Sequence, residues 1–155
     1  MPDTTIAEYV AKKQYVVGFC FVPNEGNVIL IRKNKPAWQE GKLNGVGGSI
    51  EAGETAMQAM EREWLEETAE PRTGWELFCT ICYAKATVFF FRTWTTECKA
   101  RTNTSEIIVR ASLGDIHGPV VPCWYAETKL HLPMLANLRY LIPMALTGDK
   151  GEMQQ

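Results

Sequence analysis

The pattern of apolar and polar positions predicts strands over much of the chain. Stretches rich in β-branched and aromatic residues are separated by glycine, proline and polar residues, which is typical of strands joined by turns. The predicted strands cover residues 15–22, 27–33, 75–85, 87–94, 107–110 and 120–125. A Pro-Asn-Glu-Gly run at residues 23–26 predicts a hairpin between the first two, and the third and fourth stretches form a second predicted pair.

A helical period replaces this alternation in the middle of the chain. Thr55 is followed three residues later by Gln58, and this spacing predicts a capping box at a helix start. Pro71 pushes the residue before it out of the α region, so the helix is predicted to end near Thr68. The sequence therefore predicts one short, well-capped helix between the two strand pairs.

Two adjoining stripes of this helix differ in chemistry. The apolar stripe, which is predicted to face the core, carries Met57, Met60 and Trp64. The other stripe carries three carboxylates, those of Glu63, Glu66 and Glu67. Like charges at this spacing repel one another, whereas a hard cation such as Mg²⁺ accepts several carboxylate oxygens. The stripe predicts a metal site, with a solvated acidic helix face as the alternative.

The tail of the chain predicts a closing helix. Its apolar residues run over residues 134–146, with Pro143 either in the first turn or breaking the helix. The sequence shows no repeat, low-complexity tract or linker, so residues 1–155 are interpreted as a single domain. Strand pairs flanked by helices predict an α/β fold in which a mixed β-sheet is sandwiched between helices (α/β/α).

Composition narrows the class of protein. The 155 residues carry a formal net charge of −2, which excludes a strongly basic surface for duplex nucleic acid. No apolar run is long enough to span a membrane, and the first residues lack the basic and apolar regions of a secretion signal. We therefore expect a cytoplasmic protein without membrane partners.

The cysteines and histidines add no predicted site. There are five cysteines, an odd number that fits reduced thiols. Cys79 and Cys82 form a Cys-x-x-Cys run within a predicted strand, where positions i and i+3 point to opposite faces. We expect a structural role for them rather than zinc binding or redox chemistry. His117 and His131 are isolated and receive no ligand role.

The glycine-rich run before the helix and the helix itself resemble the signature of the Nudix hydrolases. That signature reads G-x5-E-x7-R-E-U-x-E-E-x-G-U, where U is a bulky apolar residue. The matching positions are Gly48, Glu54, Arg62, Glu63, Trp64, Glu66 and Glu67. Ala69 stands where glycine is usual, and Glu70 stands where an aliphatic residue is usual. These two departures affect the helix end and remove no metal ligand.

The resemblance implies a set of roles. The implied metal ligands for Mg²⁺, or alternatively Mn²⁺, are the side chains of Glu63, Glu66 and Glu67 and the carbonyl oxygen of Gly47. Glu54 would pair with Arg62 and hold the loop before the helix. Glu63 is the first candidate to accept the proton of the attacking water. A further acidic ligand from a distal loop is common in the family, and Glu106 and Asp115 are the candidates.

Residues outside the signature indicate the substrate. The stretch at residues 31–48 and the tail are similar to the branch that cleanses nucleotide pools, which includes the 8-oxo-dGTP hydrolases. The resemblance implies that Asn44 and Asn137 contact the base and that Trp38 lies over the pocket. The alternatives are that Trp38 packs on its loop, that Asn44 satisfies turn backbone, and that Asn137 caps a helix. Trp124 is interpreted as core, and Lys33, Lys35 and Lys42 as phosphate contacts or solvated residues.

The favoured reading is a Mg²⁺-dependent pyrophosphohydrolase. It would cleave a noncanonical or oxidised purine deoxynucleoside triphosphate to the monophosphate and pyrophosphate. The alternatives are a Nudix hydrolase of ADP-ribose, a dinucleoside polyphosphate or a capped RNA, and a noncatalytic nucleotide-binding module. The expected partner is the nucleotide substrate, and the chain is expected to be a monomer or a homodimer.

Overall fold

The described part of the chain forms one mixed sheet with helices on both sides. The computed structural model describes residues 12–116, 134–147 and 151–154. Within these residues the sheet has eight strands in the order β3-β2-β1-β6-β5-β8, with β4 paired to β1 and β7 paired to β2. The strands are β1 (Lys13–Val22), β2 (Asn27–Arg32), β3 (Leu43–Asn44), β4 (Val46–Ser49), β5 (Glu76–Cys82), β6 (Ala86–Trp94), β7 (Ile107–Ser112) and β8 (Gly151–Gln154).

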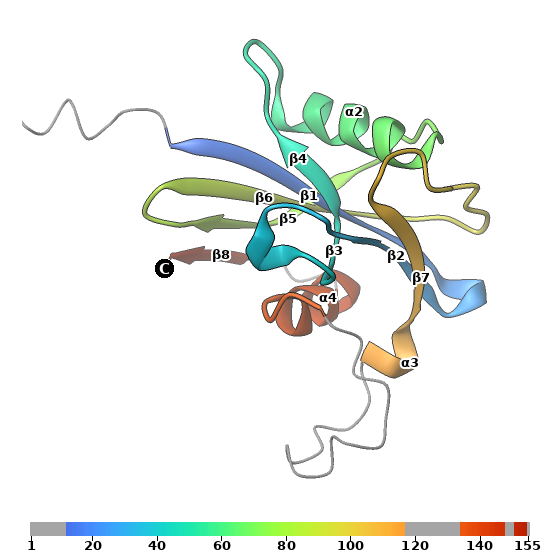
Figure 1. The fold of residues 1–155 in the computed structure, drawn as a ribbon. Helices are drawn as coiled ribbons and strands as arrows, with labels where there is room; N and C mark the ends of the chain where they lie inside the picture. Colours follow the sequence, from blue (N-terminus) through green and yellow to red (C-terminus); the bar gives the residue numbers. More distant parts are fainter. Residues whose placement is uncertain (1–11, 117–133, 148–150, 155) are drawn as a thin grey trace, which may run out of the picture.

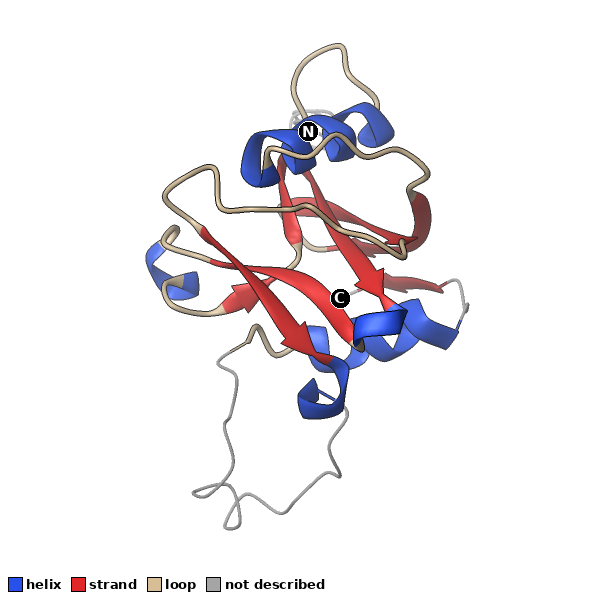
Figure 2. Cartoon of the chain, turned by 90° about the vertical axis from the view of Figure 1, so that its right-hand side faces the viewer, coloured by secondary structure: helices blue, strands red, loops and turns tan. Residues whose placement is uncertain are grey.

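The helices lie above and below this sheet (Figure 1 and Figure 2). They are α2 (Ala56–Thr68), α3 (Leu113–Ile116) and α4 (Leu138–Thr147), together with the short 3₁₀ turns η1 (Pro23–Glu25) and η2 (Ala37–Gln39). α2 covers one face, and α4 covers the other (Figure 1). The predicted α/β/α arrangement is confirmed.

Most predicted strands form. β1 and β2 make the predicted antiparallel hairpin, and β5 and β6 make the second antiparallel pair. β6 also pairs in parallel with β1, which places its phenylalanine run in the middle of the sheet. The candidate strand at residues 120–125, with Trp124, lies outside the described residues, as do His117 and His131. Three short strands, β3, β4 and β8, were not predicted.

Alternation along β1 builds two separate cores. Three of its side chains face α4, namely Val17, Phe19 and Phe21. The residues between them face α2, namely Val16, Cys20 and Val22. β2 divides in the same way, with Leu30 toward α4 and Ile29 toward α2. A central strand that is apolar on both faces requires a helix on each side, because either face alone would remain exposed to water.

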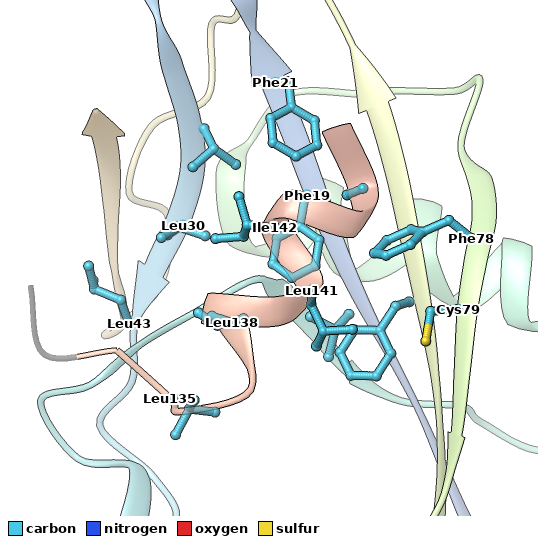
Figure 3. Close-up of a cluster of buried hydrophobic side chains, with 14 of the residues drawn as sticks. Phe19, Phe21, Leu30, Leu43, Phe78, Cys79, Leu135, Leu138, Leu141 and Ile142 are labelled. Atoms are coloured by element: carbon cyan, nitrogen blue, oxygen red, sulfur yellow. The ribbon is translucent and has the colours of Figure 1, made fainter. Parts of the chain in front are cut away.

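The α4 side of the sheet is a continuous apolar cluster (Figure 3). Leu138, Leu141 and Ile142 of α4 pack against Phe19 and Leu30. The helix begins at Leu138, later than predicted. Its sixth residue is Pro143, so the proline lies inside the helix and both predicted placements are wrong. Burial of the α4 side chains, each worth about 1.5–3 kcal/mol, offsets the roughly 3 kcal/mol that an interior proline costs.

The α2 side confirms most of the predicted helix. The capping box between Thr55 and Gln58 forms, and the helix ends at Thr68. Met60 and Trp64 are fully buried, but Met57 is 38% exposed, so its predicted core position is wrong. The buried face is rotated toward Ala59 and Glu63 instead, because the sheet contacts the helix between its apolar stripe and Glu63.

The described cysteines are free thiols. Cys79 is buried in β5, whereas Cys82 is half-buried at its end. Among the described residues, no three histidine, cysteine or acidic side chains converge in a way that holds a metal ion. The described helices are all too short, or too polar, to cross a membrane.

Candidate active site

The glycine-rich strand β4 brings the backbone of the sheet against α2. Gly47 pairs with Val17, and Gly48 pairs with Val16, in the antiparallel ladder with β1. A Cβ atom on Gly47 would collide with the carbonyl oxygen of Val16, so no side chain fits there. A Cβ atom on Gly48 would collide with the carboxylate of Glu63. Glycine at both positions therefore lets Glu63 lie directly on the strand.

Arg62 braces the loop that leads into α2. Its Nε and Nη2 atoms donate to the two carboxylate oxygens of Glu54, at 3.1 and 2.6 Å. Nη2 also donates to the carbonyl oxygen of Ser49 at 2.9 Å. The Glu54 hydrogen bonds raise the pKa of Arg62, and the Arg62 hydrogen bonds, with the Glu51 N–H, lower the pKa of Glu54. The expected Glu54–Arg62 pair is present, and it ties the loop to the helix.

The three helix carboxylates have different surroundings. Glu63 is 9% exposed and accepts a hydrogen bond from Nη1 of Arg62 at 2.8 Å. Glu66 is exposed, and Glu67 is half-buried. Oε2 of Glu67 accepts a hydrogen bond from the hydroxyl of Thr104 at 2.5 Å. Nη1 of Arg62 also donates to Oε2 of Glu66 at 3.5 Å, so Glu63 and Glu66 share a partner and Glu67 is bonded to Thr104.

The electrostatics of Glu63 differ from those of an ordinary surface glutamate. Burial raises its pKa most, the Arg62 guanidinium lowers it, and the nearby charges of Glu66 and Glu67 raise it further, so that the pKa is raised overall. A bound cation beside this group would favour the ionised form. Carboxylate and carbonyl oxygens are the donor types that a hard divalent cation prefers, although the described side chains do not converge on one cation position in this structure.

The C-terminal end of α2 is an anchored turn. Ala69 adopts a left-handed conformation, with φ of 56°, and its N–H bonds to the carbonyl of Leu65. Glu70 then accepts hydrogen bonds from Nε1 of Trp64 at 3.3 Å, from Arg72 at 3.0 Å and from the N–H of Lys99 at 2.8 Å. Burial raises the pKa of Glu70, but these donors outweigh it and the pKa is lowered. The residue that departs from the signature thus fastens the loop after β6 to the helix.

A large cavity lies beside β4. Its volume is about 1030 Å³. Gly47 and Gly48 line it, so it adjoins the strand on which Glu63 lies. The side chains proposed to contact a base come from three separate segments, and all of them line this cavity: Trp38, Asn44 and Asn137. The structure therefore brings together the residues that the sequence had marked over a span of about a hundred positions.

The side-chain amides of the cavity-lining residues differ in their hydrogen bonding. Oδ1 of Asn44 accepts a hydrogen bond from the N–H of Gly45 at 2.8 Å, which is the turn-satisfying role. Oδ1 of Asn137 and Oε1 of Gln39 are buried and accept no hydrogen bond from the described residues. Asn137 stands at the start of α4, where its carbonyl accepts the N–H of Leu141, but its side chain is not the cap. A buried polar atom without a partner is costly, about 1–3 kcal/mol.

The remaining lining combines aliphatic residues with lysines and aromatic side chains. Lys33, Lys35 and Lys42 line the cavity, and no acidic side chain is among its described lining residues. Trp38 is 64% exposed, so it does not pack tightly on its loop. Tyr83, in the turn between β5 and β6, also lines the cavity.

The two candidate distal acids lie in different places. Glu106 is buried beside the cavity lysine Lys33, at 2.8 Å. Asp115 lies in α3, and its side chain is outside what the structure describes. Sequence reasoning missed Gln39, Glu70 and Thr104. Gln39 adjoins Trp38, which is a weak signal, but nothing in the sequence marks Thr104 as a partner of the helix.

Comparisons with known proteins agree with this geometry. Residues 12–141 match the family model of the NUDIX domain. The chain is similar in structure to the NUDIX domain of NrtR from Shewanella oneidensis, complexed with ADP ribose (TM-score 0.70, 17% identity, covering 95% of this chain and 98% of that one). It is also similar to a MutT protein from Bacillus halodurans (TM-score 0.65, 19% identity, 92% and 89% covered). A third similar structure is an ADP-ribose pyrophosphatase from Streptococcus suis (TM-score 0.59, 13% identity, 93% and 98% covered). At these identities the structural likeness establishes the fold alone.

Proposed function

The chain belongs to the Nudix family of hydrolases, and we propose that it is a Mg²⁺-dependent pyrophosphohydrolase of a purine deoxynucleoside triphosphate. An oxidised or otherwise noncanonical purine is the favoured base. The products are the nucleoside monophosphate and pyrophosphate. The same proposal places the enzyme in the cytoplasm, where free thiols such as those of the described cysteines persist.

The observation that carries this proposal is a pair of cavity-lining amide residues whose buried side-chain oxygens accept no hydrogen bond from the described residues. Oε1 of Gln39 and Oδ1 of Asn137 are both buried acceptors, and both residues line the same space. Because these oxygens are enclosed, a base would reach them only after the amide side chains turn toward it, and its hydrogen-bond donors would then satisfy them. A guanine-type edge carries ring N–H and amino donors, and 8-oxoguanine adds a further ring N–H. Aromatic side chains of Trp38 and Tyr83 at the cavity wall suit a flat base.

The charged lining suits the rest of a nucleotide. Three lysines border the cavity, and the glycines of β4 connect it to Glu63. A triphosphate lying from the lysines toward α2 would meet positive charge first and the proposed metal ligands next. The net charge of the chain is negative, so this local excess of lysine is a property of the cavity and not of the whole surface.

The residues of the site have separable tasks in hydrolysis. Nudix hydrolases generally use a divalent metal, and Glu63, Glu66, Glu67 and the Gly47 carbonyl are the proposed ligands. When bound, the cation neutralises charge on the phosphate oxygens and makes water more acidic. Glu63, buried against Gly48, is the proposed acceptor of the proton from the attacking water, whose oxygen bonds to phosphorus as the phosphoanhydride bond breaks. Arg62 and Glu54 keep the loop and the helix in register.

A second candidate is hydrolysis of ADP-ribose. Two similar folds are described with this ligand or activity, the NrtR NUDIX domain and the ADP-ribose pyrophosphatase. The adenine amino group also supplies donors for an amide oxygen. A cavity of about 1030 Å³ is large enough for either ligand.

Product analysis across a substrate panel tests the proposal. We expect release of pyrophosphate from 8-oxo-dGTP or another purine deoxynucleoside triphosphate with Mg²⁺, at a higher kcat/KM than for pyrimidine triphosphates or ADP-ribose. Faster cleavage of ADP-ribose, yielding AMP without pyrophosphate, would favour the second candidate. The variant Glu67→Gln, prepared in parallel, shows whether the activity belongs to this chain, because a contaminating enzyme would survive the substitution. Binding without turnover of any compound would overturn both proposals.

A further inference from the structure

A short segment, residues 103–106, contacts both parts of the site. It lies between the loop after β6 and the start of β7. The sequence predicts Glu106 as a candidate metal ligand. It predicts no role for the three residues before it. Its hydrogen bonds lead in two directions, one toward α2 and one toward the cavity.

The first direction is toward α2. The hydroxyl of Thr104 donates to Oε2 of Glu67 at 2.5 Å. Asn103 donates its side-chain N–H to the carbonyl of Glu66 at 2.8 Å and its backbone N–H to the carbonyl of Glu67 at 3.2 Å. Carbonyls in the last turn of a helix have no partner within the helix, so these bonds satisfy them. The segment therefore holds both the end of α2 and one carboxylate of its acidic side.

The second direction is toward the cavity. Glu106 is 4% exposed, and its two oxygens have different partners. Oε2 accepts from Nζ of Lys33 at 2.8 Å, and Oε1 accepts from the N–H of Asn34 at 3.1 Å. Lys33 lines the cavity. A buried carboxylate that is already bonded through both oxygens holds its cation firmly, because leaving either charge unpaired would cost about 3–5 kcal/mol.

The two directions meet within the segment. Oγ1 of Thr104 donates to Glu67 and accepts the N–H of Glu106 at 3.2 Å. Ser105 accepts a hydrogen bond from the side chain of Asn34 at 2.7 Å. A continuous set of hydrogen bonds thus runs from Glu67 on α2, through Thr104 and Glu106, to Lys33 in the cavity.

We propose that residues 103–106 position the acidic side of α2 relative to the cavity. In this arrangement Thr104 orients Glu67, and Glu106 orients Lys33 toward a phosphate of the substrate. In this assignment Glu106 is a positioning residue that acts through Lys33, and it is not a metal ligand. The inference rests on the proposed function, since it requires a substrate that carries phosphates. Its test uses binding, so that it does not depend on which nucleotide is hydrolysed.

The test compares four single variants and one double variant in two binding experiments. The single variants are Thr104→Val, Glu106→Gln, Lys33→Met and the control Ser105→Ala, which removes a hydrogen bond of the same segment without touching Glu67 or Lys33. Mn²⁺ binding is measured by electron paramagnetic resonance, and binding of tripolyphosphate is measured by calorimetry in the presence of Mg²⁺. Thermal unfolding of each variant reports whether it is folded.

We expect the variants to affect either Mn²⁺ binding or tripolyphosphate binding, but not both. Thr104→Val should weaken Mn²⁺ binding about tenfold, the size seen when a group that orients a metal ligand is lost. Glu106→Gln and Lys33→Met should each weaken tripolyphosphate binding about tenfold, as expected for one displaced charged contact, and leave Mn²⁺ affinity unchanged. The double variant Glu106→Gln/Lys33→Met should bind tripolyphosphate no more weakly than Lys33→Met alone, because both changes remove the same interaction. Ser105→Ala should match the wild type in both experiments.

Contrary results are equally specific. A loss of Mn²⁺ affinity in Glu106→Gln would make Glu106 a metal ligand and overturn the assignment. Wild-type affinity for tripolyphosphate in Lys33→Met would overturn it as well, even if Glu106→Gln failed to fold. Mn²⁺ affinity that is unchanged in Thr104→Val would remove the role of Thr104. A chain that shows the expected binding pattern but cleaves no purine triphosphate would sink the proposed substrate and leave this inference standing.

Discussion

The α2 region and the cavity beside it meet their hydrogen-bonding needs in opposite ways. Around α2, Glu54, Arg62 and Glu70 each make several short hydrogen bonds to other protein groups. In the cavity, Gln39 and Asn137 each keep a buried oxygen without a protein partner. The first region is complete in the protein alone, whereas the second holds two oxygens for which we propose that a bound base supplies the donors.

This difference separates two kinds of site residue. Groups that the protein satisfies internally act by keeping a rigid geometry, and their loss should reduce both stability and rate. Groups that the protein leaves unsatisfied cost stability in the free state, and their loss should change recognition without weakening the fold. The predictions below use substitutions in the two regions to test this contrast.

The largest effect is expected on the acidic side of α2. Glu67→Gln should lower kcat by about 10²-fold or more, about 2.7 kcal/mol, because an amide replaces a proposed anionic metal ligand. Steady-state kinetics at saturating Mg²⁺ measures this change. Glu61→Gln, on the same helix, is the matched control and should retain the wild-type rate. A Glu67→Gln enzyme as fast as the control would contradict the ligand assignment.

The next effect concerns the cavity. Asn137→Ala should raise KM for the favoured purine about tenfold and reduce discrimination between bases, which corresponds to about 1.4 kcal/mol. The substitution removes no hydrogen bond to this oxygen from the described residues, so the melting temperature should not fall for that reason.

Asn44→Ala provides the comparison for this variant. Its oxygen already accepts the Gly45 N–H, so its removal should lower the melting temperature. Equal losses of kcat/KM for every base in Asn137→Ala would show that Asn137 has no part in base recognition.

A smaller effect is expected at the end of α2, and it depends on pH. Glu70→Gln should lower the free energy of unfolding by about 1 kcal/mol at neutral pH, because charge-assisted hydrogen bonds become neutral ones. The pKa of Glu70 is lower in the folded chain than the ordinary value of 4.5. Its contribution is therefore present above pH 4.5 and is lost as the pH falls through the lower, folded pKa.

Urea unfolding at neutral and acidic pH measures this dependence. The difference in unfolding free energy between wild type and Glu70→Gln should shrink as the pH falls below 4.5. A difference that stays constant over this range would mean that the charge of Glu70 does not stabilise the loop after β6.

The smallest effect is expected at Ala69, and it should be stabilising. The left-handed backbone costs a residue with a Cβ atom about 1–2 kcal/mol, whereas glycine loses about 0.5–1 kcal/mol of chain entropy. Ala69→Gly should therefore raise the free energy of unfolding by roughly 0.5–1 kcal/mol. Ala56→Gly, in the first turn of α2, should have the opposite sign. If both variants were destabilised alike, the backbone at Ala69 would not be the cause.

The α2 region was the part of the molecule that sequence reasoning described best. The capping box, the helix end, the pairing of Glu54 with Arg62 and the grouping of three carboxylates all follow from positions fewer than twenty residues apart. Local spacing determines which side chains share a helix face. The prediction for Met57 was wrong because the helical period gives the stripes but not the direction from which the sheet approaches.

The cavity depended on tertiary structure at every step. The sequence, through its resemblance to a family, marked Trp38, Asn44 and Asn137 one by one, and each also had a plain structural explanation. Only the folded chain places them around one cavity with three lysines. Strand pairing and the packing of α4 on the sheet bring together segments that are far apart in sequence. Thr104 had no sequence signal and Gln39 had only a weak one beside Trp38, since their roles come from contacts that the fold creates.

The sequence by itself thus determined the reaction class, through a compact motif whose chemistry depends on short spacing. Tertiary structure decided which groups surround the substrate and which remain unpaired. Burial and hydrogen-bond partners belong to the packed molecule, so no pattern along the chain reports that an amide oxygen is enclosed without a donor. In this protein that enclosed oxygen, at Asn137 and again at Gln39, is the feature from which the proposed purine specificity follows.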